Sequence, residues 1–174
     1  LINGDNEFGI TVHFIDEGID TGDILLQRTF PITLDDNYST LLEIAHKECA
    51  LILYDAIKML QAGNYQRIAQ KTIHNTGFYC GVRTYGDEII NWNQNSLDVY
   101  NFIRAICSPG PKAHTSFNQQ VVKINSARLI EDAPCYKSTV GQIVGKTNSG
   151  FIIKTTDSTI EIFDIESDVK LKIG

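Results

Sequence analysis

The sequence lacks the features of membrane and secreted proteins. No apolar run approaches the roughly 20 residues needed to span a bilayer, and the start shows no signal-peptide pattern. The few cysteines are widely spaced and form no C-x-x-C pair; they are Cys49, Cys80, Cys107 and Cys135. Such spacing is typical of reduced thiols in the cytosol, where disulfides are rare. We therefore predict a cytoplasmic protein that neither enters a membrane nor depends on disulfides.

Concentrated positive charge is also absent. Residues 75–174 hold ten Lys and Arg against ten Asp and Glu, whereas residues 1–74 hold five and eleven. Together these give the totals of 15 basic and 21 acidic residues and the net charge of −6. Because phosphate contacts need clustered Lys and Arg, a nucleic acid is an unexpected partner. The hydrophobic content of 43% fits one ordinary domain or two small ones with a real core.

Possible metal ligands at a suitable spacing are also few. His46 and Cys49 are three residues apart on an expected helix and could share a metal. Two ligands without a further cluster are a weak signal, and helix packing explains the pair better. We therefore predict no metal site.

The most informative segment of the sequence is acidic and is interrupted by glycines. It spans residues 9–27 and reads GITVHFIDEGIDTGDILLQ. Apolar and polar residues alternate at its start, which predicts a strand with a buried face. Glycines there allow unusual backbone angles or close approach to a ligand, and carboxylates surround them: Asp16, Glu17, Asp20 and Asp23, with Gly18 and Gly22. A solvated acidic turn is the simplest interpretation. Apolar strands on both sides hold the turn near the core, where ionised groups are costly, so we predict a functional site.

The pattern G-I-T-V-H followed by a D-T-G turn resembles the methionyl-tRNA formyltransferase family. Its members use 10-formyltetrahydrofolate and include the nucleotide-sugar N-formyltransferases. The resemblance implies that Asp20, the first aspartate of the D-T-G turn, is catalytic and supports an upstream histidine during proton transfer. It also implies that the backbone of this turn lines the pterin pocket, which assigns cofactor binding to Asp16, Glu17, Gly18, Ile19 and Asp20. Asp23 is the second choice for a functional carboxylate.

One part of the family pattern is missing from these 174 residues. Relatives carry an asparagine, a histidine two residues later and a Ser-Leu-Leu-Pro stretch upstream of the turn. The element LINGDNEFG at the start of this sequence follows that histidine in relatives. The resemblance therefore implies the C-terminal part of a longer enzyme, which alone should bind folate poorly and catalyse nothing. His13 is interpreted as an ordinary strand histidine and not as a replacement.

A strand and a long helix are expected after the turn. Residues 23–32 form an apolar run, and Asp35-Asp36-Asn37 supplies the chemistry of a helix start. Apolar residues then recur at helical steps as far as Gly63 and predict one buried face: Leu41, Ala45, Cys49, Ile52, Ala56 and Leu60. The polar residues 63–87 are interpreted as a linker with a boundary near residue 75. The chain is thereby divided into residues 1–74, the end of a catalytic domain, and residues 75–174.

The second domain is expected to hold a helix and a small barrel. Asn95 or Ser96 can cap a helix that stops at Pro109, and Trp92 is interpreted as a packing anchor. Apolar segments from residue 115 onward are separated by Asn-Ser-Gly and Thr-Asp-Ser turns, which predicts short strands. The resemblance implies an OB-like barrel. The expected fold class is α/β: the C-terminal part of a Rossmann-like formyltransferase domain, followed by a small OB-like β-barrel domain.

Three functions are compatible with the sequence. Residues 9–27 and the acidic chain resemble the sugar-modifying members of the family more than the tRNA enzymes. That resemblance implies transfer of a formyl group from 10-formyltetrahydrofolate to the amine of a nucleotide-linked amino sugar. Formylation of initiator methionyl-tRNA is the alternative, and it predicts a basic channel. The third is a noncatalytic binding module that uses the barrel as a partner surface. The quaternary structure is left open, a homodimer included.

Overall fold

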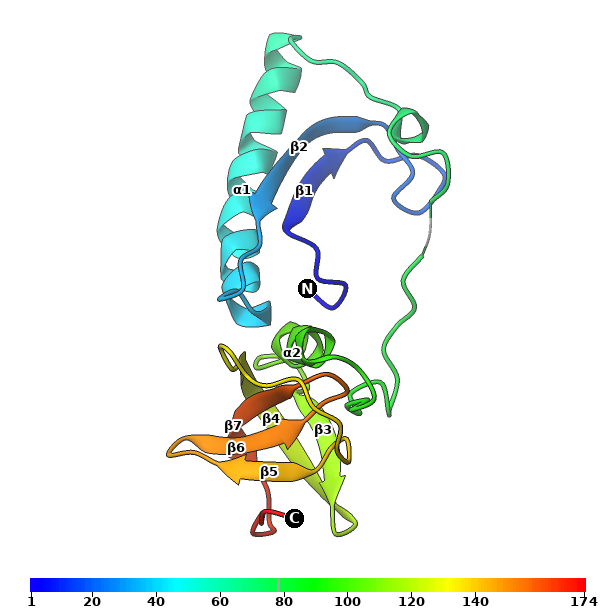
Figure 1. Cartoon of the computed structure of the whole chain (residues 1–174). Helices are drawn as coiled ribbons and strands as arrows, with labels where there is room; N and C mark the ends of the chain where they lie inside the picture. Colours follow the sequence, from blue (N-terminus) through cyan, green and yellow to red (C-terminus); the bar gives the residue numbers. More distant parts are fainter. Residues whose placement is uncertain (78) are drawn as a thin grey trace. The chain divides into compact units, whose positions relative to one another are not determined.

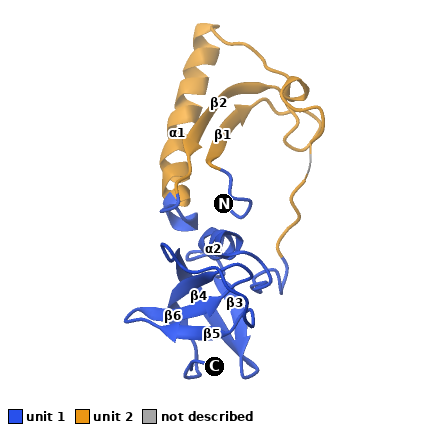
Figure 2. Ribbon diagram, in the orientation of Figure 1, with its two compact units in different colours: residues 1–5, 34–40, 84–174 blue, residues 6–33, 41–83 orange. Residues whose placement is uncertain are grey.

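The computed structural model describes residues 1–77 and 79–174 (Figure 1). The chain forms two compact units (Figure 2). Unit 1 holds residues 1–5, 34–40 and 84–174, and unit 2 holds residues 6–33 and 41–83. Residue 78, within the expected linker, lies outside the described residues.

Unit 2 is built on an antiparallel pair of strands, as the alternating pattern predicts. Strand β1 spans Glu7–His13 and strand β2 spans Ile24–Pro31. Their register places Ile10 opposite Arg28. The acidic turn therefore joins two paired strands, and its position is fixed by their register.

The long helix α1 spans Tyr38–Ala62, which confirms the predicted helix. At its start the backbone N–H of Thr40 donates to the side-chain oxygen of Asn37 over 3.1 Å, while the hydroxyl of Thr40 accepts from the backbone N–H of Asn37 over 3.0 Å. This reciprocal pair satisfies two backbone donors that a helix start leaves free.

The predicted buried face of α1 is only partly correct. Ile52 and Ala56 are buried, but Cys49 and Leu60 are exposed. A helix of 25 residues is about 37 Å long. Within the described part of unit 2 the sheet beside it has only two strands, so full burial is limited to little more than one helical turn.

Unit 1 contains the start of α1, the helix α2 and a five-stranded antiparallel sheet with the order β3-β4-β7-β6-β5. Helix α2 is followed by these strands in chain order, and the bounds are α2 Ser96–Ala105, β3 Ala113–Phe117, β4 Gln120–Leu129, β5 Ile143–Lys146, β6 Gly150–Lys154 and β7 Thr159–Glu166. Over the described residues no pairing joins β3 to β5, so the expected closed OB-like barrel is not confirmed. The structure shows a mixed α/β protein with antiparallel sheets.

The core of unit 1 lies between α2 and its sheet. Asn95 caps the helix by accepting from the backbone N–H of Asp98 over 2.8 Å, as predicted. Apolar residues of the helix and the sheet form one buried cluster, which includes Val99, Ile103, Ile106, Val122, Ile124, Ile160 and Ile162. Arg104 is also buried and donates to the side-chain oxygen of Asn101 over 2.9 Å.

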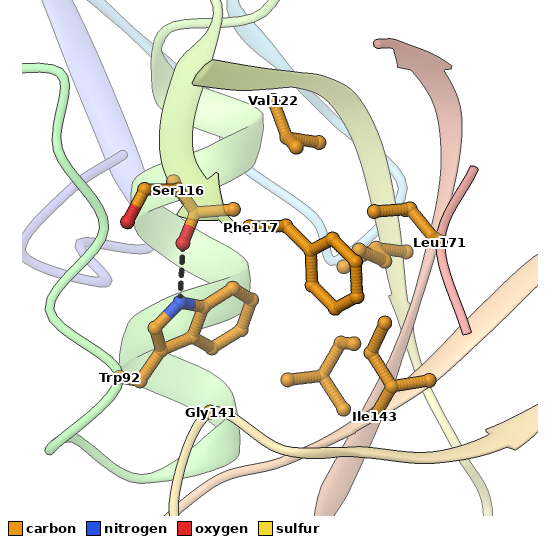
Figure 3. Close-up of a pocket in the computed structure, with 10 residues that line it drawn as sticks. Trp92, Ser116, Phe117, Val122, Gly141, Ile143 and Leu171 are labelled. Atoms are coloured by element: carbon orange, nitrogen blue, oxygen red, sulfur yellow. Dashed lines mark hydrogen bonds between the residues drawn. The ribbon is translucent and has the colours of Figure 1, made fainter. Parts of the chain in front are cut away.

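Trp92 packs against this cluster, which confirms its interpretation as a packing anchor (Figure 3). Its indole N–H donates to the hydroxyl of Thr115 over 2.9 Å. The adjoining cavity, of about 40 Å³, is far smaller than a pocket for a drug-sized ligand, which is roughly 300 to 1,000 Å³. Trp92 therefore serves the core of unit 1.

Candidate active site

The acidic turn, residues 14–23, is closed at its base by a backbone hydrogen bond. The N–H of Phe14 donates to the carbonyl of Asp23 over 2.9 Å. Gly22 lies directly against this closure, and a Cβ at Gly22 would fall 1.6 Å from the carbonyl oxygen of Phe14. Only glycine fits there. The close approach predicted toward a ligand is, for Gly22, an approach to the backbone of the turn itself.

Asp16 organises the first half of the turn. One of its carboxylate oxygens accepts from the hydroxyl of Thr21 over 2.6 Å and from the backbone N–H of Gly18 over 3.0 Å. These bonds, that from Thr21 above all, hold the pKa of Asp16 below its usual value of 3.8. Asp16 is therefore an ionised residue that shapes the turn.

Asp20 occupies the tip of the turn with a positive φ of 56°, a conformation that aspartate tolerates better than most residues. Its side chain is 86% exposed, and a carboxylate oxygen lies 3.6 Å from Nε2 of His13. The other ring nitrogen of His13 is 2.9 Å from the carbonyl of Phe14. An exposed carboxylate next to an imidazole is suited to holding or orienting a proton at this tip.

Apolar side chains flank these carboxylates. Ile15 is 94% exposed and Ile19 is 73% exposed, although both are large hydrophobic residues. Glu17 is exposed between them. The turn therefore presents carboxylates, apolar side chains and backbone polar groups to its surroundings, a combination common in small-molecule sites.

Two residues of the segment after α1 also hold the turn, a role that no sequence pattern predicted. Arg67 pairs with Asp23 over 3.0 Å, and its guanidinium lies 4.1 Å from the ring centroid of Phe14. Gln70 donates from its side-chain nitrogen to the carbonyls of Asp20 and Gly22, each over 2.8 Å. Both residues lie in a stretch of mixed polar and apolar residues without periodicity, so no local pattern could reveal them.

Other expected or conceivable sites gain no support from the geometry. Across residues 1–77 and 79–174, no group of three or more metal-ligating side chains comes together. His46 and Cys49 are both exposed on α1. No helix among the described residues has both the length and the apolar character needed to cross a bilayer.

Two family models match the chain. The model described as formyl transferase, C-terminal domain, covers residues 83–173, and the model described as formyl transferase covers residues 1–57. The methionyl-tRNA formyltransferase of Pelotomaculum thermopropionicum is 30% identical over 166 residues, which are 95% of this chain and 51% of that protein. The chain thus spans about half the length of the curated relatives that it matches.

Solved structures of sugar-modifying enzymes share the fold. The sugar 3N-formyl transferase WlaRD, solved in the presence of dTDP and 5-N-formyl-THF, has a TM-score of 0.69 and 26% identity, over 97% of this chain and 58% of that one. An N-formyltransferase from Helicobacter canadensis, in complex with folinic acid and dTDP-3-aminofucose, has a TM-score of 0.68 and 24% identity, over 95% of this chain and 58% of that one. The turn, the two family models and these relatives agree, and the chain belongs to the formyl transferase family.

Proposed function

We propose that this chain is part of an enzyme that moves a formyl group from 10-formyltetrahydrofolate to the amine of a nucleotide-linked amino sugar. The observation that carries the proposal is the similarity to a sugar 3N-formyl transferase, at 26% identity and a TM-score of 0.69. That structure was solved with dTDP and a formylated folate, which are the two classes of ligand the proposal requires.

The acidic turn suits a folate ligand. A pterin has flat apolar faces and an edge of hydrogen-bonding groups, so its site needs both apolar contacts and backbone polar groups. Ile15 and Ile19 expose their side chains beside the backbone of the turn. We assign pterin binding to the backbone of Asp16–Asp20, and 10-formyltetrahydrofolate supplies the formyl group when it is bound there.

Asp20 is the residue to which we assign catalysis. Formylation of an amine requires the nitrogen to lose a proton as its bond to the formyl carbon forms. The exposed carboxylate of Asp20 can stabilise a neighbouring imidazolium and so help an imidazole take up that proton. The family resemblance places the catalytic histidine upstream of this turn, and the position of Asp20 at the tip leaves its carboxylate available to such a partner.

Formylation of methionyl-tRNA is the second candidate, and the curated relatives favour it because several are methionyl-tRNA formyltransferases. Charge argues against it. Residues 75–174 carry equal numbers of basic and acidic side chains, ten of each. A tRNA surface needs an excess of Lys and Arg, whereas a nucleotide diphosphate needs only a few cationic groups.

The acceptor can be identified by comparing formyl transfer to two substrates. The full-length gene product that contains this chain would be incubated with 10-formyltetrahydrofolate and either a dTDP-linked 3-amino sugar or methionyl-tRNA. We expect efficient transfer to the sugar amine. Preferential transfer to methionyl-tRNA, with a rate that falls steeply as salt rises, would establish the second candidate.

The role of Asp20 can be tested by Asp20→Asn in the same gene product. Asparagine tolerates a positive φ, so the fold should be kept while the charge is lost. We expect kcat to fall by about 100-fold or more, in the range of general acid-base effects. Asp132→Asn is the matched control, because Asp132 is an exposed aspartate at φ 53° in unit 1. Near-normal turnover in Asp20→Asn would refute the assignment.

A further inference from the structure

The segment after α1, residues 64–72, returns to the edge of the hairpin that carries the acidic turn. Ile68 and Ile24 exchange two backbone hydrogen bonds, of 2.8 and 3.0 Å, at the first residue of β2. Two residues later the segment enters a short 3-10 helix, Gln70–Thr72. The backbone pairing thus places Gln70 beside the turn in a fixed register.

The amide group of Gln70 binds the turn at two points, of which Asp20 is at the tip. Its side-chain nitrogen carries two hydrogens, and the structure places carbonyl acceptors at Asp20 and Gly22, each at 2.8 Å. These two carbonyls lie on either side of Thr21. The contact therefore fixes the peptide planes between Asp20 and Thr21 and between Gly22 and Asp23, and with the first of them the direction in which the side chain of Asp20 leaves the backbone.

The position of the Asp20 side chain depends on contacts that hold the backbone at the tip of the turn. Asp20 has a φ of 56°, a left-handed conformation that most non-glycine residues avoid. Its carboxylate is 86% exposed and lies 3.6 Å from His13, too far for a strong hydrogen bond. Side-chain packing contributes little to its position, so the placement of Asp20 depends on the atoms that hold its main chain.

We propose that Gln70 is a positioning residue for formyl transfer: it locks the turn so that the carboxylate of Asp20 points consistently toward its proton partner. This inference rests on the proposed function. Arg67 acts with it, because its pairing with Asp23 and its contact with the ring of Phe14 secure the base of the turn. Gln70 holds the tip and Arg67 holds the base, so the segment after α1 is a structural part of the site.

The unmodified chain allows a direct test by NMR. Both side-chain amide protons of Gln70 should show slowed exchange with solvent and shifts typical of hydrogen-bonded protons. Gln66, an exposed glutamine four residues earlier, is the internal reference. Side-chain signals of Gln70 that match those of Gln66 would overturn the proposal without any variant having to fold.

Gln70→Met then tests the catalytic consequence, with Gln66→Met as the matched control. Methionine keeps the length of the side chain but has no hydrogen to donate. Hydrogen exchange of the amides in residues 14–23 should accelerate about tenfold in Gln70→Met and stay unchanged in the control. In the full-length gene product kcat should fall by about 10- to 100-fold while KM for the acceptor amine stays within about twofold.

These measurements test the positioning role of Gln70 and the proposed function separately. Thermal unfolding of both variants shows whether Gln70→Met retains its fold, and unchanged exchange in the turn or an unchanged kcat would overturn the positioning role. Absence of formyl transfer by the unmodified enzyme would overturn the proposed function and the catalytic role of Gln70 with it. The NMR and exchange data would still decide whether Gln70 holds the turn.

Discussion

Asp157 joins the start of α2 to the turn between β6 and β7, and its charge should make unit 1 sensitive to acid. One carboxylate oxygen accepts from the backbone N–H of Ser96 over 2.9 Å and from that of Ser158 over 2.8 Å. The hydroxyls of Ser96 and Thr155 donate to the same oxygen, each over 3.0 Å. Burial raises the pKa of Asp157, but these hydrogen bonds outweigh it and lower the pKa from 3.8 to about 2.

The size and direction of the effect follow from this pKa. A difference between 3.8 and about 2 corresponds to roughly 2.4 kcal/mol, which solvent screening of this exposed side chain reduces to about 1 to 2 kcal/mol. Because the pKa is lowered in the folded state, the stabilisation is fully present well above pH 3.8. It is lost as the pH falls through the folded value of about 2, and about half of it remains at pH 3.

Asp157→Asn tests this reasoning because it removes the charge and keeps most of the shape. At pH 7 the free energy of unfolding of unit 1, measured with urea, should fall by about 1 to 2 kcal/mol. The deficit should shrink by about half at pH 3. Asp168→Asn, which removes an exposed carboxylate from the same unit, should change little at either pH. A deficit of equal size at pH 7 and pH 3 would refute an electrostatic origin.

Two further substitutions test the packing. Gly22→Ala places a Cβ 1.6 Å from the carbonyl of Phe14 and should destabilise unit 2 by about 1 to 3 kcal/mol, whereas Gly81→Ala, with no neighbour within 4 Å, should be neutral in thermal unfolding. On β4, Val122 is buried and Val121 is 57% exposed. Val122→Ala should cost about 1 to 3 kcal/mol in urea unfolding and Val121→Ala less than about 0.5; similar costs would contradict the observed register.

Sequence patterns predicted the elements whose periodicity is strong. The alternation before the acidic turn gave β1, and the apolar steps after Asn37 gave α1. Strand β3, Ala113–Phe117, was not predicted, because its sequence AHTSF has no run of β-branched apolar residues. It becomes a strand through pairing with β4, where Ala113 lies opposite Ile124. Tertiary pairing, which local sequence does not encode, determines this element.

In the candidate site, too, the residues close together in the sequence could be predicted, whereas those brought in from a distance could not. Asp16, Gly18 and Gly22 could be singled out because they lie close together in sequence, and the structure gives each a definite role in the turn. Gln70 lies 50 positions after Asp20 in the sequence and contacts it only in the fold. Its neighbours mix polar and apolar residues and follow no repeat, so only the return of the chain after α1 brings the two together.

The return of the segment after α1 to the acidic turn also determines how much of the chain the candidate site requires. The family model that contains Asp20 matches residues 1–57, a range that ends before the segment that holds the turn. Unit 2 continues to Arg83, and within it Ile68 pairs with Ile24 and Gln70 bonds to the turn. Since an exposed carboxylate with a positive φ takes its direction from its backbone, the residues that fix that backbone belong to the site as much as the carboxylate does. The candidate site around Asp20 is therefore better defined by these contacts than by the extent of the sequence match.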